Sequence, residues 1–209
     1  MSIVHDVEQG SDAWRKLRAG VPSASCFDKI ITSTGAESKQ RAGYAKTLAA
    51  ELYSGSPLDD AWTGNKWTER GKELEDEAVR WYEFDQDVKT ERVGFVTTDD
   101  GSAGCSPDRF VGTHGLLEIK CLKSENHVDA IMYFRKHGAP PTDYIQQTQG
   151  QLMVTGRQVS HLLFYSPQLP SLVIKQGPLL QVIGGLIIGI KRLIEERDEI
   201  VKVLREYGA

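Results

Sequence analysis

Three charged residues of this chain stand at spacings that could bind a metal ion: Asp108, Glu118 and Lys120. A turn candidate, residues 112–115 (Gly-Thr-His-Gly), lies midway between the two acids. If the flanking segments pair as a hairpin about Thr113, Asp108 lies directly opposite Glu118, and such partners have Cβ atoms about 4.5–5.5 Å apart. Lys120 then projects from the same face as Glu118, because side chains alternate along a strand. The sequence therefore predicts two carboxylates and an ammonium in close proximity.

Two carboxylates this close repel each other, which raises the pKa of one of them unless a cation lies between them. The surroundings offer little water, since Leu117, Ile119 and Cys121 give the second strand one apolar face. On the other face, Leu116 and Leu122 bracket Glu118 and Lys120. A divalent ion would relieve the repulsion, and hard oxygen ligands favour Mg²⁺ or Mn²⁺. The alternative is an exposed hairpin whose Glu118–Lys120 pair is ordinary surface charge, because structural ion pairs resemble functional clusters.

The length and composition are those of one ordinary globular domain. The chain has 209 residues, of which 40% are hydrophobic and 26% charged, and domains of about 100–200 residues are typical. No repeat, low-complexity tract or linker is apparent, so we expect a single domain over residues 1–209. The net charge of -4 argues against a protein that coats nucleic acid over its whole surface. Basic residues after the predicted hairpin would suit one local groove: Lys123, Arg135, Lys136 and His137.

Targeting and redox features predict a cytoplasmic protein. The first residues lack the basic and then apolar regions of a signal peptide. The apolar segment 179–190 is too short to cross a bilayer, which takes about 20 residues, and is expected to begin a buried helix. Cys26, Cys105 and Cys121 form an odd set without zinc-site spacing, so neither a disulfide framework nor a zinc site is indicated. We expect reduced thiols and no membrane association.

Apolar periodicity and capping residues predict helices around one sheet. Helices are expected from an N-cap at Ser11 to residue 18, after an N-cap at Ser23, and over residues 43–52, 68–84, 126–136, 142–154 and 180–206. Strands are expected over residues 88–97, 104–111, 116–122, 159–165 and 172–175, and a loop over residues 57–65. Because strands and helices do not alternate regularly, we predict an α/β fold with a central mixed β-sheet flanked by helices.

Two of the predicted helices could deliver side chains to the hairpin. Gly71 and Glu75 stand one turn apart, and a glycine there would let the helix approach the sheet, so that Glu75 could add a third carboxylate. The alternative is that Glu75 belongs to an ordinary acidic helix surface. Gln147 and Gln151 also share one helix face, where buried amides cost stability unless they are hydrogen-bonded. They would donate to phosphate oxygens or hold the attacking water, or else form a plain polar face.

Taken together, these motifs resemble a known nuclease superfamily. Ser106-Pro107-Asp108 followed by Glu118-Ile119-Lys120 resembles the PD-(D/E)xK signature of restriction-endonuclease-like nucleases. Residues 71–75 (Gly-Lys-Glu-Leu-Glu) resemble its upstream helix motif, and Gln147 with Gln151 resembles its downstream glutamine motif. More specifically, residues 8–21 resemble the opening of the phage lambda exonuclease, or YqaJ-like, alkaline nucleases. The pattern departs from the family in extra acids beside Glu75 and in Gln151, where an aromatic residue is common.

The resemblance implies a restriction-endonuclease-like fold and an exonuclease that depends on Mg²⁺. Mn²⁺ is expected to substitute for Mg²⁺. Such enzymes degrade one strand of a DNA duplex 5′→3′, release 5′-mononucleotides and leave 3′ single-stranded overhangs. It also implies duplex ends with a 5′-phosphate as substrate, a ring-shaped homotrimer, and a single-strand annealing protein as partner in recombination. A phage or prophage origin, with the enzyme in the cytoplasm of the bacterial host, is implied in the same way.

The resemblance further implies a role for each matched residue. The metal ligands would be Asp108, Glu118 and the backbone carbonyl of Ile119, with Glu75 supporting a second ion. Lys120 would position or deprotonate the attacking water, and Gln147 would hold that water or the phosphate. Guanidinium forks and hydroxyls suit a terminal 5′-phosphate, and the matched phosphate-binding set is Arg18, Ser25 and Ser106, with Trp14 as a further substrate-binding residue.

On this basis we predict in-line attack on the scissile phosphorus by a water that the bound ion activates. One alternative is a restriction-type endonuclease on the same fold, which would cut circular duplex. Another is a catalytically inactive DNA-end-binding recombination scaffold, against which the intact acidic and lysine residues argue. A third is a protein–protein interaction domain that uses the apolar C-terminal helix.

Overall fold

The computed structural model describes residues 2–58 and 66–208, and the side chains of residues 2–58 and 74–208. The α-helices are α1 (Asp12–Arg18), α2 (Arg41–Ser54), α3 (Lys66–Gln86), α4 (Ser124–His137), α5 (Ile145–Thr155) and α6 (Leu180–Tyr207), and the 3₁₀ helices are η1 (Ala24–Lys29) and η2 (Thr142–Tyr144). The strands are β1 (Ser2–His5), β2 (Thr90–Arg92), β3 (Phe95–Thr98), β4 (Gly104–Cys105), β5 (Arg109–Val111), β6 (Gly115–Lys120), β7 (Val159–Phe164) and β8 (Leu172–Gln176).

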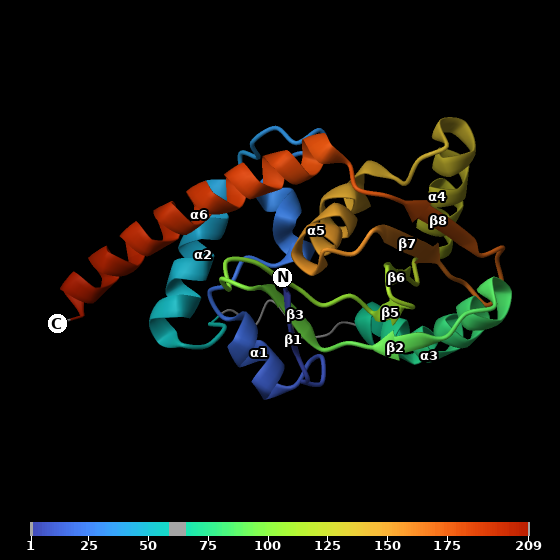
Figure 1. The fold of residues 1–209 in the computed structure, drawn as a ribbon, viewed down its shortest axis with the longest axis horizontal. Coiled ribbons are helices and arrows are strands. Elements are labelled where there is room, and N and C mark those ends of the chain that lie inside the picture. The colour runs from blue at the N-terminus through green and yellow to red at the C-terminus, as the bar shows by residue number, and fades with distance from the viewer. Residues whose placement is uncertain (1, 59–65, 209) are drawn as a thin grey trace.

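The central sheet has five strands in the order β2-β5-β6-β7-β8 (Figure 1). Strands β6 and β7 are parallel and all other neighbours are antiparallel, so the sheet is mixed, as predicted. In the β5–β6 hairpin Arg109 pairs with Leu117 and Val111 with Gly115. One step further along the same register places Asp108 opposite Glu118, which confirms the predicted pairing about Thr113.

Helices cover both faces of this sheet (Figure 1). On β6 and β7 the odd-numbered residues, such as Leu117 and Leu163, have one parity and pack against Ala78 and Tyr82 of α3. Residues of the other parity face α4 and α5, because side chains alternate along a strand; Phe164, for example, packs with Ala130 of α4. Glu118 and Lys120 have this second parity, so the fold directs them toward α5.

The predicted strand over residues 88–97 was only partly right. It divides at Val93 and Gly94 into β2, in the central sheet, and β3, in a second sheet of order β1-β3-β4. Gly94 lets the chain pass close to the N-terminal segment at this point, because a Cβ there would collide with the backbone oxygens of His5 and Val7. The N-terminal strand β1 was not predicted. It is short and mostly exposed, so it lacks the alternation that marks a strand.

The predicted strand over residues 104–111 is also divided, and the division places the acidic site. Strand β4 belongs to the second sheet and β5 to the central sheet, so Ser106-Pro107-Asp108 is the link between the two sheets. Pro107 has no N–H to donate to a ladder, which favours an interruption at this point. Asp108 therefore lies at the junction of the two sheets.

Capping predictions met with different outcomes. Ser11 is the N-cap of α1, and its hydroxyl accepts a hydrogen bond from the Trp14 N–H, as predicted. Ser23 precedes η1 but makes no capping hydrogen bond with its side chain. Its hydroxyl accepts instead from Arg18. The predicted loop over residues 57–65 falls mostly on residues 59–65, which lie outside the described residues.

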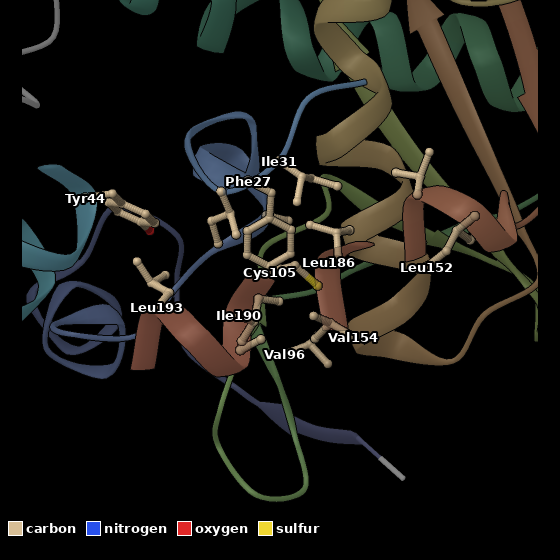
Figure 2. Close-up of a cluster of buried hydrophobic side chains, with 14 of the residues drawn as sticks. Phe27, Ile31, Tyr44, Val96, Cys105, Leu152, Val154, Leu186, Ile190 and Leu193 are labelled. Carbon is tan, nitrogen blue, oxygen red and sulfur yellow. The ribbon is translucent and has the colours of Figure 1, made fainter. Parts of the chain in front are cut away.

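The largest hydrophobic cluster lies between the second sheet and the helices η1, α2, α5 and α6 (Figure 2). Phe27 and Leu186 are fully buried at its centre. Helix α5 approaches η1 closely at Gly150, where a Cβ would collide with the ring of Phe27. This contact fixes the position of the glutamines on either side of Gly150. In the described part of the chain, no helix is both long enough and apolar enough to cross a membrane.

A buried histidine beneath α3 predicts a pH dependence of stability. Burial, with a smaller effect of Lys175, lowers the pKa of His161 from 6.5 to about 4, and His161 is hydrogen-bonded to the hydroxyl of Tyr82. The folded state favours the neutral ring. Above pH 6.5 the ring is neutral in both the folded and the unfolded state, so His161 does not lower the free energy of unfolding. As the pH falls from 6.5 toward 4, protonation of the unfolded chain lowers the free energy of unfolding progressively. The loss amounts to at most about 3 kcal/mol, at about 1.36 kcal/mol per pKa unit.

The measurement is urea unfolding between pH 7 and pH 4 of the wild-type protein and of His161→Gln. The variant is expected to lose most of the acid-dependent decline, and His114→Gln, which alters an exposed histidine, should keep it. An equal decline in the wild type and His161→Gln would contradict the assignment.

Candidate active site

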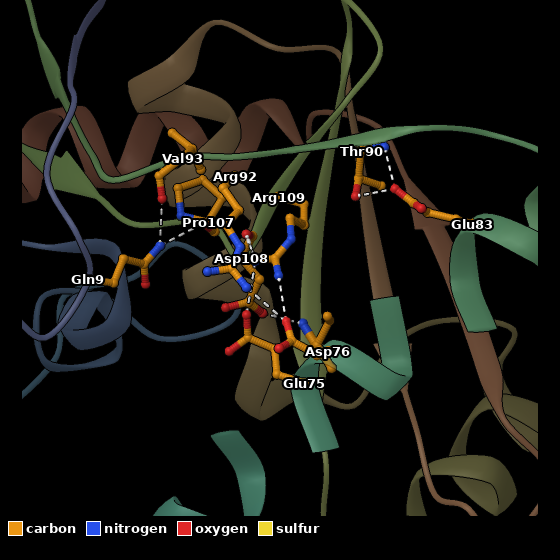
Figure 3. Close-up of polar contacts among 11 residues, drawn as sticks. Gln9, Glu75, Asp76, Glu83, Thr90, Arg92, Val93, Pro107, Asp108 and Arg109 are labelled. Atoms are coloured by element: carbon orange, nitrogen blue, oxygen red, sulfur yellow. Dashed lines mark hydrogen bonds and ion pairs between the residues drawn. The ribbon is translucent and has the colours of Figure 1, made fainter. Parts of the chain in front are cut away.

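Asp108 is held at the start of the β5–β6 hairpin (Figure 3). Its Oδ2 accepts a hydrogen bond from the Ile119 N–H at 2.6 Å, which fixes the carboxylate against the facing strand. The preceding turn is fixed by Gln9, whose Nε2 donates to the carbonyls of Val93 at 2.9 Å and Pro107 at 3.0 Å. Gln9 thus holds together the two points at which the chain passes between the sheets.

Glu118 lies at the centre of a hydrogen-bond network and is only 4% exposed. Its Oε1 accepts from Lys120 Nζ at 2.8 Å and from Gln147 Nε2 at 2.6 Å, while its Oε2 accepts from Gln151 Nε2 at 2.5 Å. Lys120 also donates to Gln147 Oε1 at 3.0 Å, and its ammonium lies 5.5 Å from the centroid of the Tyr144 ring. The hairpin and α5 therefore meet at one buried polar centre.

The electrostatics of this centre follow from its burial. Burial raises the pKa of the Asp108 carboxyl well above its ordinary value, and the neighbouring Glu118 charge raises it further. Burial opposes the charge of Lys120, but the Glu118 carboxylate outweighs it and raises the pKa of the ammonium. The two acids thus repel each other in a place where water cannot screen them, and one lysine compensates only part of the charge.

Glu75 reaches the edge of this centre from α3 but is already paired. Its Oε1 accepts from Arg109 Nη1 at 2.9 Å, and Arg109 also contacts Asp76 at 3.5 Å (Figure 3). Its negative charge contributes to the raised pKa of Asp108, so the two carboxylates interact. Within the predicted motif over residues 71–75, the side chains before residue 74 lie outside the described residues.

The predicted phosphate-binding residues form a second cluster around Arg18. Its Nη2 donates to the hydroxyls of Ser23 at 2.9 Å and Ser25 at 3.3 Å, and its guanidinium lies 4.1 Å from the centroid of the Trp14 ring. Trp14 Nε1 in turn donates to Ser106 Oγ at 2.9 Å. The four predicted residues are thus brought together, and Ser23 joins them.

The two clusters are neighbours. Ser106 stands two residues before Asp108, so one turn supplies both. Burial raises the pKa of the Cys105 thiol, the Glu118 charge raises it further, and the Arg18 charge lowers it, so this thiol interacts with both clusters. Among the described residues no carboxylate forms an ion pair with Arg18. Burial lowers the pKa of its guanidinium, so an anion placed there would favour its charged form.

Residues 13–158, more than half of the chain, match the model of the YqaJ-like viral recombinase domain. The chain belongs to this family. The matched span contains the acidic hairpin, the glutamines of α5 and the cluster around Arg18. No curated protein matches the chain.

Solved structures show the same fold. The alkaline exonuclease LHK-Exo from Laribacter hongkongensis is 26% identical, with a TM-score of 0.82 over 95% of this chain and 98% of that chain. A complex of LHK-Exo with dAMP matches equally well. A phage-related exonuclease from Haemophilus somnus 129PT, 16% identical, has a TM-score of 0.67 over 88% of this chain and 96% of that chain. The α/β architecture is therefore that of the alkaline exonucleases.

The sequence analysis did not assign several residues that lie around Asp108 and Glu118. Arg109 was not singled out, although a charged residue directly after Asp108, at the start of an apolar strand, was a usable signal. Gln9 was noted only as part of the matched opening segment, because nothing in the sequence places it beside Pro107. Gln151 was considered together with Gln147 but was not assigned to the site. Its Nε2 binds Glu118, and its Oε1 is buried without a hydrogen-bond partner.

The donor set fits a hard divalent cation. Asp108 and Glu118 offer facing carboxylates, and the backbone carbonyl between Glu118 and Lys120 is a further oxygen, which suits Mg²⁺ or Mn²⁺. The raised pKa of Asp108 marks a place where a bound cation would relieve repulsion. In the described residues the side chains of His, Cys, Asp and Glu do not form a group of three that could hold a metal ion.

Proposed function

We propose that this protein is a Mg²⁺-dependent 5′→3′ double-stranded DNA exonuclease, folded as a single domain over residues 1–209. The observation that carries the proposal is the buried pairing of Asp108 with Glu118, joined by Lys120 and Gln147. The likeness to an alkaline exonuclease across nearly the whole chain supports the same reaction class. The dAMP bound to that relative supports a nucleic-acid substrate that yields nucleoside monophosphates.

Asp108, Glu118 and the carbonyl of Ile119 would hold the Mg²⁺, for which Mn²⁺ can substitute. When bound, such an ion lowers the pKa of water, polarises a non-bridging phosphate oxygen and offsets the charge on the leaving 3′ oxygen. Lys120 and Gln147 hold Glu118 in place from two sides, so that its carboxylate keeps one orientation. The ion would then meet ligands that are already positioned.

Lys120 is the residue that we propose to act on the attacking water or the phosphate. The raised pKa of its ammonium favours a donor over a general base, so Lys120 would clamp the water or stabilise negative charge on the phosphate. Gln147 presents both an amide oxygen and an amide nitrogen at the same point and can orient that water. Lys120 projects from β6 toward α5, and Gln147 meets it from α5.

The cluster around Arg18 would bind the terminal 5′-phosphate. A guanidinium and the hydroxyls of Ser25 and Ser106 donate to phosphate oxygens, and charge-assisted bonds of this kind are the strong ones. Trp14 fixes both Arg18, through its ring face, and Ser106, through its indole N–H. An anchored 5′ end beside the acidic hairpin would place the first phosphodiester at the ion, which favours stepwise removal of single nucleotides from the 5′ end.

Replacing Arg18 with alanine tests this pocket. A hydrogen bond to a charged group contributes about 1.5–3 kcal/mol, so the single-turnover rate on 5′-phosphorylated duplex should fall by about 10–100-fold. The rate on 5′-hydroxyl duplex, already low in the wild type, should change little. Arg15→Ala, which alters an exposed arginine on the same helix, is the matched control. An equal fall in rate on the two substrates would show that Arg18 does not bind the 5′-phosphate.

The proposal also covers the reaction products, the partner protein, the oligomeric state and the cellular setting. We infer that the products are 5′-mononucleotides and a duplex with a 3′ single-stranded overhang, which a single-strand annealing protein would use in recombination. The chain would act as a homotrimer in the cytoplasm of a bacterial host that carries a phage or prophage. Membership of the viral recombinase family supports this setting.

The deciding experiment is incubation of linear, 5′-phosphorylated duplex with the purified protein, with and without Mg²⁺. Mononucleotides released only with Mg²⁺, from the 5′ end of each strand, are the expected products. A circular duplex should stay intact, and its cleavage would favour a restriction-type endonuclease. Binding to DNA ends without release of nucleotides would favour an inactive scaffold.

A further inference from the structure

We propose that Arg109 stands in for a second metal ion at Glu75, so that the active site holds one divalent ion per chain. This inference rests on the proposed function, because it concerns the ion that Asp108 and Glu118 would bind. The second ion that the family resemblance implies would be supported by Glu75. In the structure, the Glu75 carboxylate is paired with the guanidinium of Arg109, the residue directly after Asp108.

The position of Arg109 follows from the hairpin register. Arg109 pairs with Leu117 on β6, so its side chain has the parity that faces α3, opposite to that of Asp108. On that face, Nη1 donates to Glu75 of α3 at 2.9 Å and to the Asp108 carbonyl at 2.6 Å. One guanidinium nitrogen therefore joins the helix acid to the residue that carries the metal-binding carboxylate.

The burial of Arg109 makes this pairing durable. The Arg109 side chain is only 7% exposed, whereas that of Glu75 is 34% exposed. An arginine buried to this extent cannot leave its partner cheaply, since an uncompensated buried charge is strongly destabilising. Glu75, in contrast, could turn to water if the arginine were absent. The pair therefore depends on Arg109 staying in place.

A fixed cation at this point disfavours a second one. A divalent ion on Glu75 would have to displace the guanidinium or bind beside it, and like charges at such distances repel. Asp76, the acid next to Glu75 in the chain, accepts from Arg109 at 3.5 Å and from the exposed Arg92 at 2.9 Å, so it is also engaged. Arg109 is thus a positioning residue that supplies positive charge beside Asp108 without being a metal ligand.

The test is the stoichiometry of Mn²⁺ binding, measured by titration calorimetry and by the paramagnetic resonance of free Mn²⁺. Titrations are run without nucleotide and with dAMP, whose phosphate could complete a second site. The wild-type protein should bind one ion per chain in both conditions. Arg109→Ala, which frees Glu75, should bind two. Arg92→Ala removes an exposed arginine that shares Asp76 and should still bind one.

Glu75→Gln separates the models without touching Arg109. A chain that uses Glu75 as a ligand would lose an ion in this variant, whereas we expect the stoichiometry to stay at one. Two ions in the wild type, or one ion in a folded Arg109→Ala, would overturn the inference while leaving the proposed exonuclease intact. If Arg109→Ala fails to fold, loss of an ion in Glu75→Gln overturns it in the same way. A wild-type protein that binds no Mn²⁺ would overturn both.

Discussion

Asp108→Asn should abolish Mg²⁺-dependent DNA hydrolysis and, in the absence of divalent ions, stabilise the fold. The loss of activity should exceed about 10²-fold, because even residues that only support metal ligands cost about 10–100-fold when they are changed. The gain in the free energy of unfolding should be about 1–2 kcal/mol at pH 8, a common range for a single stabilising substitution. The same substitution thus changes activity and stability in opposite directions.

The sign of the stability change follows from the pKa of Asp108. Burial and Glu118 raise that pKa in the folded state, so ionisation of Asp108 opposes folding at every pH above the ordinary value of the carboxyl. Asparagine removes the charge, and its side-chain oxygen can still accept from the Ile119 N–H. The benefit should therefore grow as the pH rises and vanish in acid, where aspartic acid is neutral in both states.

The measurement is urea unfolding with EDTA at several pH values, together with single-turnover cleavage. Asp129→Asn, which neutralises an exposed acid on α4, should change neither quantity appreciably. Added Mg²⁺ should stabilise the wild type and not Asp108→Asn. A variant that is less stable than the wild type at pH 8, or that still hydrolyses DNA, would contradict the place given to Asp108.

Lys120→Ala should lower the rate of the chemical step by about 10²–10⁴-fold while DNA binding is preserved. Lys120 donates to both Glu118 and Gln147, so its removal takes away the only cation that these described residues share. The binding of the 5′-phosphate depends on the separate cluster around Arg18 and should not suffer. The effect should therefore appear in single-turnover cleavage and not in the dissociation constant for duplex measured with Ca²⁺.

Two controls make the result for Lys120 specific. Lys89→Ala removes an exposed lysine away from the hairpin and should leave the rate unchanged. Thermal unfolding of Lys120→Ala must show a folded protein, because Glu118 loses a buried partner. Near-normal single-turnover cleavage by a folded Lys120→Ala would remove Lys120 from the mechanism.

The local spacing of the sequence was enough to predict the acidic hairpin. A turn midway between Asp108 and Glu118 sets the register, and the period of two places Lys120 on the same face. The alternation of apolar residues around Glu118 also predicted that this face would be buried. These are short-range properties, in which the residues that interact are close in the chain or are related by one simple turn.

Tertiary structure decided which distant residues complete the site. Gln147 and Gln151 reach Glu118 because α5 packs across the sheet, and Gln9 reaches Pro107 across most of the N-terminal half. The pairing of Arg109 with Glu75 likewise depends on the packing of α3 against one face of the sheet. No local pattern encodes these contacts, since each depends on how whole elements pack over long sequence separations.

The division of two predicted strands has the same origin. Residues 88–97 and 104–111 have the composition of continuous strands, and the sequence alone determined that they are extended. Only the folded chain shows that each passes from one sheet to the other, where Gly94 avoids a collision with a distant backbone and Pro107 cannot join a ladder. Because β-propensity reports a local preference, it cannot say which partner strand satisfies each half. That choice is what places Asp108 between Glu118 and the phosphate-binding cluster.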